Sequence, residues 1–113
     1  MKLLGQRILR KYKKKNLGNR ALTKAIDRLI SDFEESEISN LEQLHKIRPD
    51  ADRVHPDGYF IFNLVNHRTM ILIELINNES TILWCGNHDS YETTFKNNKS
   101  TIKKWLKSKN YLK

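Results

Sequence analysis

Three apolar runs in the second half of the chain most restrict the folds open to it. The runs "GYFIFNLV", "TMILIELI" and "STILWC" are rich in β-branched and aromatic residues, and only "NHR" and "NNE" separate them. Connections of this length join antiparallel neighbours. The runs therefore predict three adjacent strands of an antiparallel sheet.

Helical periodicity appears on both sides of this sheet. The pattern between residues 20 and 36 is the longest, with apolar side chains at positions that share one helix face: Leu22, Ile26, Leu29, Ile30 and Phe33. We expect a shorter helix over about 6–15, and a final one from Ser100 to Lys109, within about 98–109, that packs Ile102, Trp105 and Leu106 inward. "MKLLG" is a candidate first strand.

The order of these elements predicts an α+β fold in a single domain spanning residues 1–113. Two N-terminal helices are expected to pack on one face of a twisted antiparallel sheet of three or four strands, with a short C-terminal helix after it. The other face of the sheet is expected to be free of covering helices. Segment 41–58 is expected to cross from the helices to the sheet.

Positive charge is concentrated at the two ends of a chain whose formal net charge is +8. Residues 1–20 carry eight basic side chains and no acid, and residues 96–113 carry seven lysines and no acid. Such ends favour binding to a polyanion, because each phosphate contact releases counterions. The alternative is that the charge serves solubility only. The residues expected to contact RNA or the ribosome are Lys46, Arg48, Arg53, Lys96, Lys99, Lys103, Lys104 and Lys107.

Several other classes of protein are disfavoured. The first residues do not resemble an export signal, and no apolar run reaches the length of a membrane span, so we expect a soluble cytoplasmic protein. Cys85 is the only cysteine, which excludes an internal disulfide and a thiolate zinc site. It is expected to be a small core residue. No cofactor is expected.

The sequence "GNHDSY" at the end of the third run gathers side chains that can handle protons. His88, Asp89 and Tyr91 lie within four positions, and His67 and Arg68 are expected in a nearby hairpin turn. Cleavage of RNA without a metal needs an acid, a base and a cation on the phosphate, which imidazole and guanidinium groups supply. The alternative is structural: His88 belongs to a turn, Asp89 caps a helix beginning at Ser90, and Tyr91 is packed.

The order of elements and two segments, "PDADRVHPDGYFIFNL" and "WCGNHDSY", resemble the HigB-type toxins of the RelE/ParE superfamily. In that family a strand ending Gly-Thr-His is followed by a short acidic stretch with a tyrosine. The likeness covers about residues 1–95, and the segment after it looks like an added basic helix. The resemblance implies a RelE-like fold.

For function, the resemblance implies a metal-independent endoribonuclease that cuts mRNA in the ribosomal A site. Its partners would be the ribosome, mRNA and a helix-turn-helix antitoxin of the HigA type. His88 and Tyr91 match the active-site histidine and tyrosine of the family, Asp89 lies within the same motif, and His55 lies near another functional histidine of some relatives.

One departure concerns the arginines that relatives carry inside the strands, where this chain has Met70 and Leu83. The cation at the phosphate would then be Arg68, Arg53, Arg48 or a lysine. Two other functions stay open: a ParE-like toxin that poisons DNA gyrase, and a nucleic-acid-binding protein without catalysis.

Overall fold

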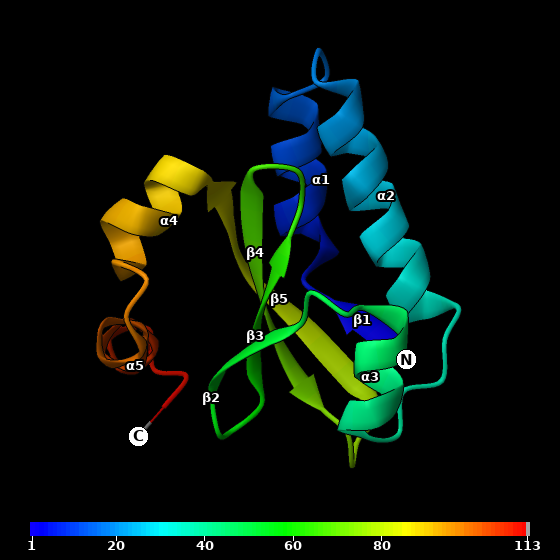
Figure 1. Cartoon of the computed structure of the whole chain (residues 1–113), viewed down its shortest axis with the longest axis vertical. Helices are drawn as coiled ribbons and strands as arrows, with labels where there is room; N and C mark the ends of the chain where they lie inside the picture. The colour runs from blue at the N-terminus through cyan, green and yellow to red at the C-terminus, as the bar shows by residue number, and fades with distance from the viewer. Residues whose placement is uncertain (113) are drawn as a thin grey trace.

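The computed structural model describes residues 1–112, and within them five helices surround a five-stranded sheet (Figure 1). The strands lie in the order β1-β5-β4-β3-β2. In chain order the elements are β1 (Lys2–Leu4), α1 (Gln6–Lys15), α2 (Arg20–Glu34), α3 (Leu41–Ile47), β2 (Asp52–His55), β3 (Tyr59–Asn63), β4 (His67–Glu74), β5 (Glu79–Asn87), α4 (His88–Phe95) and α5 (Lys99–Ser108).

The α+β class is confirmed, but the sheet differs from the prediction in two ways. It has five strands, because the crossing segment forms α3 and β2, and β2 pairs with β3 at the edge. It is also mixed, because β1 runs parallel to β5, with Leu3 opposite Ser80. The connection from β1 through both N-terminal helices to the hairpins makes this parallel pairing possible.

Helices cover both faces of the sheet, so the prediction of a free face is wrong. Figure 1 shows α1 and α2 on one side and α4 and α5 on the other. The reason lies in β3 and in residues 70–73 of β4, where apolar side chains follow one another instead of alternating with polar ones. Tyr59 and Ile61 point to one core, and Phe60 and Phe62 point to the other. A strand with apolar side chains on both faces needs cover on both.

The first core lies between the N-terminal helices and the sheet. Leu22, Ile26 and Phe33 of α2 are fully buried there, as the helical stripe predicted. Phe33 contacts Phe62 of β3 edge to face, with 5.5 Å between ring centroids. Cys85 is partly buried against the same core, as expected. Burial raises the pKa of its thiol to about 12.

The second core lies under α4 and α5. Tyr91 and Phe95 of α4 and Ile102 and Leu106 of α5 are buried against the face of the sheet that carries Ile61 and Met70. The ring of Phe95 meets Trp84 and Trp105 edge to face, at 5.0 and 5.2 Å. The C-terminal helix is therefore part of the fold.

No helix within residues 1–112 has the length and apolar character needed to cross a membrane.

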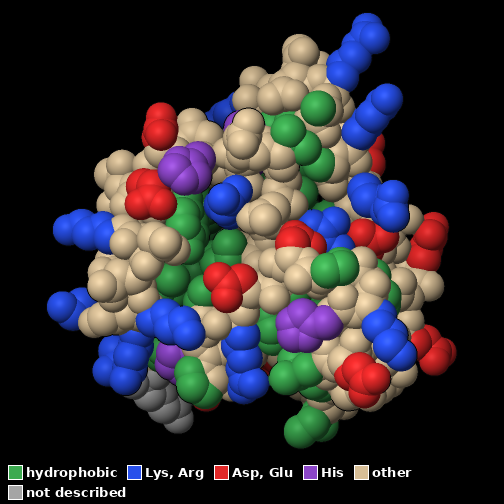
Figure 2. Space-filling view, viewed as in Figure 1, with side chains coloured by type: hydrophobic (Ala, Val, Ile, Leu, Met, Phe, Trp, Pro, Cys, Tyr) green, Lys and Arg blue, Asp and Glu red, His purple; other side chains and the backbone are tan. Residues whose placement is uncertain are grey.

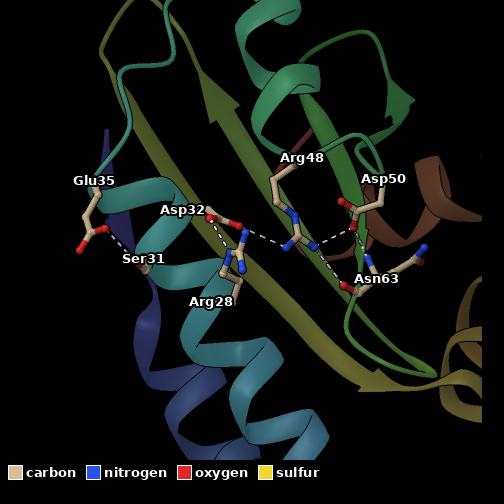
Figure 3. A network of polar contacts seen from close by, with 7 residues as sticks. All are labelled: Arg28, Ser31, Asp32, Glu35, Arg48, Asp50 and Asn63. Atoms are coloured by element: carbon tan, nitrogen blue, oxygen red, sulfur yellow. Dashed lines mark hydrogen bonds and ion pairs between the residues drawn. The ribbon is translucent and has the colours of Figure 1, made fainter.

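A polar network around Arg48 joins α2 to the segment before β2 (Figure 3). The Arg48 guanidinium contacts the carboxylates of Asp32 at 3.4 Å and Asp50 at 2.8 Å, and donates to the carbonyl oxygen of Asn63 at 3.1 Å. Asp50 in turn accepts the backbone N–H of Asn63 at 2.9 Å. The Arg48 side chain is 13% exposed, so these charges lie largely out of water.

A second polar contact joins α1 to the start of β4. The Tyr12 hydroxyl lies 2.6 Å from Nδ1 of His67, and the two rings meet edge to face at 5.5 Å. Burial lowers the pKa of His67 and raises the pKa of Tyr12. Both shifts favour the neutral forms of the two groups, in which the Tyr12 hydroxyl keeps its proton and can donate a hydrogen bond to the imidazole.

We expect Arg48→Ala to lower the free energy of unfolding by about 3 kcal/mol, because it leaves two partly buried carboxylates without their cation. Urea unfolding at neutral pH would measure this loss. The control is Arg28→Ala, which removes the exposed partner of Asp32 and should cost less than about 1 kcal/mol. Equal losses for the two variants would contradict this account of the network.

The His67 pKa predicts an acid-sensitive contribution to stability. Because the folded-state pKa is below the ordinary 6.5, the unfolded chain takes up this proton first as the pH falls. The contribution of His67 to stability is complete above its pKa in the unfolded state. It is lost as the pH falls through its pKa in the folded state. Between about pH 7.5 and about pH 5, wild type should lose more stability than His67→Gln. Parallel curves for His67→Gln and wild type would contradict the prediction.

Candidate active site

An open pocket of about 260 Å³ lies between the sheet and α4. Two apolar side chains, Ile61 and Tyr91, form part of its wall. The remaining lining is polar and comes from four elements and the turns beside them: Asp50, Asp52, Asn63, Arg68, His88, Glu92 and Asn97. Three residues singled out from the sequence therefore surround one cavity: Arg68, His88 and Tyr91.

The end of β5 places His88 at the rim of this pocket. The Asn87 side chain accepts the backbone N–H of Ser90 at 2.7 Å, so Asn87 caps α4 and His88 is its first residue. The alternative that Asp89 caps this helix is wrong. The His88 backbone N–H also donates to the carbonyl oxygen of Asn66 at 3.0 Å, which ties the helix start to the β3–β4 connection.

Close packing just before the helix requires a glycine. A side chain on Gly86 would begin 2.6 Å from the Trp84 ring and 3.2 Å from the Ser90 side chain. Gly86 also lies opposite Arg68 in the ladder between β4 and β5. The glycine of "GNHDSY" thus leaves room for the Trp84 ring beside the start of α4.

Two carboxylates lie near the His88 ring. Its Nε2 is 3.7 Å from Oε1 of Glu92, one turn further along α4, and its Nδ1 is 3.9 Å from Oδ1 of Asp89. The His88 side chain is 54% exposed and that of Asp89 fully exposed. The imidazole is open to solvent and to a ligand, and the Glu92 carboxylate lies beside it.

Arg68 is the cation of the pocket. It lies inside β4, opposite Asn63 and Gly86, and the expectation that it belongs to a hairpin turn is wrong. The turn is Leu64–Asn66, where Val65 and Asn66 adopt positive φ. The Arg68 guanidinium lies 6.0 Å from the Tyr91 ring centroid and donates to the His67 carbonyl oxygen at 3.1 Å. Within residues 1–112 it forms no ion pair.

Tyr91 is packed and also reaches the pocket. Its side chain is buried beside Trp84 and Phe95, as the structural alternative expected. Burial raises the pKa of its hydroxyl, the charges of Asp52 and Glu92 raise it further, and that of Arg68 opposes them. The hydroxyl therefore stays protonated at neutral pH and is available as a hydrogen-bond donor.

Two histidines lie away from this pocket. His67, next to Arg68 in β4, contacts Tyr12 of α1 as described above. His55 lies in β2, where its ring meets Tyr59 at 5.7 Å and its Nδ1 accepts the backbone N–H of Asp57. It faces α5 across two further hollows. The catalytic roles expected for these two histidines stay predictions, and neither shares a cavity with His88.

The residues expected to bind RNA have different surroundings. Arg48 is enclosed by its carboxylate partners, while Lys46 is exposed on α3, 3.8 Å from Glu42. Arg53 is exposed and donates to the Pro56 carbonyl oxygen. The lysines between positions 96 and 107 are all exposed: Lys96, Lys99, Lys103, Lys104 and Lys107. Their binding roles stay predictions.

Three carboxylates of the pocket were not predicted from the sequence: Asp50, Asp52 and Glu92. Glu92 follows His88 by four positions, a spacing that would have paired the two side chains had a helix been predicted from residue 88. Asp52 comes from β2, which was not predicted as a strand. Within residues 1–112 no group of three or more His, Cys, Asp or Glu side chains is arranged to hold a metal ion.

Comparison with known proteins identifies a family for the chain. A family model described as HigB_toxin, the RelE-like toxic component of a toxin-antitoxin system, matches residues 22–94. No curated protein matches the chain. The matched region runs from α2 through α4 and contains every polar pocket residue except Asn97. The chain therefore belongs to the HigB family of RelE-like toxins, which are toxic components of toxin-antitoxin systems.

Proposed function

We propose that this toxin is a metal-independent endoribonuclease that cuts mRNA, at the ribosomal A site, and so stops translation. The observation that carries the proposal is the convergence of His88, Arg68 and Tyr91 on one open pocket. An imidazole, an unpaired guanidinium and a protonated phenol are the groups that phosphodiester cleavage without a metal needs.

The proposed reaction is an attack by the ribose 2′-oxygen on the adjacent phosphorus. The bond between the 2′-oxygen and phosphorus forms, the bond to the 5′-oxygen breaks, and the products are a 2′,3′-cyclic phosphate and a 5′-hydroxyl. His88 removes the 2′-hydroxyl proton, and Glu92, 3.7 Å from Nε2, stabilises the resulting imidazolium. Arg68 binds the non-bridging oxygens, where charge builds up.

Tyr91 is proposed to act through its hydroxyl. Because its pKa is raised, the phenol keeps its proton and can hydrogen-bond the phosphate or protonate the departing 5′-oxygen. Its ring packs against Trp84 and Phe95, so the hydroxyl needs little reorganisation when RNA binds.

The proposed partners follow from membership in a toxin-antitoxin family. The toxin is held inactive by an antitoxin, which we propose to be a helix-turn-helix protein of the HigA type. When free of it, the toxin acts on ribosomes in the cytoplasm. Expression of the chain alone should then arrest growth with loss of mRNA, whereas DNA damage would indicate a gyrase poison.

We expect His88→Ala to lower the rate of RNA cleavage by about 10²–10⁴-fold, the usual effect of losing a general acid or base. Arg68→Ala should lower the rate of RNA cleavage by about 10²–10³-fold, and Arg68→Lys should recover part of that rate. Mapping of RNA 5′ ends after incubation with mRNA-loaded ribosomes measures both. His45→Ala is the matched control, because His45 is not among the residues that line the pocket.

Urea unfolding of the same variants separates chemistry from stability. The His88 side chain is half exposed, so its removal should change the free energy of unfolding by less than about 1 kcal/mol. A folded His88→Ala protein that cuts RNA at the wild-type rate would overturn the proposed site.

Tyr91→Phe keeps the packed ring and removes only the hydroxyl. We expect cleavage about 10–100-fold slower, with the free energy of unfolding changed by no more than about 1 kcal/mol. Single-turnover kinetics distinguish the two roles, since loss of proton donation slows the chemical step, whereas loss of phosphate binding raises the RNA concentration needed. A rate unchanged at every RNA concentration would show that the residue serves packing alone.

A further inference from the structure

The charge of the proposed active site raises a physical difficulty for its substrate. The pocket contains Asp52 and Glu92, while Arg68 is its one unpaired arginine or lysine among residues 1–112. Asp50 adds a third carboxylate, already paired with Arg48. A polyanion entering this pocket meets more negative than positive charge. Cations outside the pocket must hold the RNA strand if it is to stay bound.

Two further hollows lie between β2 and α5. The first, of about 450 Å³, is lined by Arg53, Val54, His55 and Pro56 on one side and Lys99 on the other. The second, of about 490 Å³, is lined by His55 and Asp57 opposite Lys103, Lys107 and Tyr111. We call this pair of hollows the α5–β2 groove.

The groove and the proposed active site share no lining residue, but their walls are built from adjoining residues of the chain. Asp52 of the pocket is followed in β2 by Arg53 of the groove, and Asn97 of the pocket precedes Lys99 by two positions. Lys96 and Asn97 both adopt positive φ, which turns the chain sharply between α4 and α5. Asn98 then caps α5 by accepting the backbone N–H groups of Ser100 and Thr101.

Three lysines line the α5 wall of the groove. Lys99, Lys103 and Lys107 follow one another at intervals of four residues, so they form a row about 12 Å long on one helix face. α5 contains no acidic residue, and within residues 1–112 these lysines form no ion pair. Figure 2 shows Lys and Arg side chains gathered over α5, at the lower left.

An exposed aromatic ring lies at the far end of this row. Tyr111 is 43% exposed, and its backbone carbonyl oxygen accepts the Tyr59 hydroxyl at 3.1 Å. Its ring packs against that of Trp105, with 6.1 Å between the ring centroids. A basic row ending in a held, exposed aromatic ring is suited to a single nucleic-acid strand, because phosphates bind the lysines and a base stacks on the ring.

We propose that the α5–β2 groove binds the RNA strand on one side of the bond to be cut, with Lys99, Lys103 and Lys107 on successive phosphates and Tyr111 under a base. The inference rests on the proposed function for the identity of the strand. It assigns a role to α5, which lies outside the matched residues 22–94.

The test compares two triple variants with the same change in charge. In the groove variant, Lys99, Lys103 and Lys107 become glutamine. In the control, the exposed α1 residues Lys11, Lys14 and Lys15 become glutamine. The probe is a labelled single-stranded 2′-O-methyl RNA, which cannot be cut because its 2′-oxygen is blocked. Fluorescence anisotropy gives its affinity over a range of salt concentrations.

We expect the groove variant to bind the RNA at least about tenfold more weakly. The slope of log affinity against log salt concentration should become shallower by about two units, since each single-strand phosphate contact contributes about 0.7. The control should lose less than about threefold. Tyr111→Leu should weaken binding with the salt slope unchanged. Equal losses in the two triples would overturn the groove in favour of general electrostatic attraction. Unchanged RNA binding in the groove variant would also overturn the proposal. Weaker binding of the antitoxin by that variant would then indicate that the surface serves the antitoxin.

Cleavage of unmodified RNA by wild type separates this inference from the proposed function. If wild type cuts RNA and the two triples bind the blocked RNA equally, the groove fails and the active site stands. If wild type does not cut RNA but the groove variant alone loses binding, the nuclease proposal fails, and the groove is supported as an RNA-binding surface.

Discussion

Burial of β3 and β4 on both faces is the constraint on which the rest of the structure depends. Alternate side chains along these strands enter two separate cores, one under the N-terminal helices and one under α4 and α5. Their edges are also occupied, since each strand pairs on both sides. In β3 and β4, only the strand ends and the adjoining loops remain open to a ligand. The pocket with Arg68, at the start of β4, and His88, directly after β5, lies at such an end.

The Arg48 network connects this open end to the first core. Asp32 belongs to α2, whereas Asp50 and Asn63 are part of the pocket wall, and the guanidinium contacts all three. The helices on the far side of the sheet thereby help to fix one wall of the pocket. The Nε atom of Arg48 has no hydrogen-bond partner within residues 1–112, so the network carries a desolvation cost. Such a cost is consistent with a network that serves position more than stability.

Much of the fold could be predicted from periodicity, and the failures have physical causes. The stripe of α2 and the apolar runs of β3, β4 and β5 are long enough to identify. β2 reads "DRVH", too short and polar for a strand signal, and "HDSYETTF" of α4 has little helical periodicity. The prediction left one face of the sheet uncovered, although continuous apolar residues in β3 and at positions 70–73 of β4 indicate burial on both faces. His88, Arg68 and Tyr91 were expected near one another and do line one pocket, whereas Asp52 depended on a strand that was not predicted.

Cys85 has a consequence for chemical labelling of this molecule. It is the only cysteine in the chain, and burial that raises its pKa to about 12 leaves almost no thiolate near neutral pH. Alkylating reagents, which attack the thiolate, should therefore react with it slowly while the protein is folded. A cysteine introduced at an exposed position would then be the one fast-reacting thiol, so a spectroscopic probe or crosslinker could be attached at a chosen point without first removing the native residue.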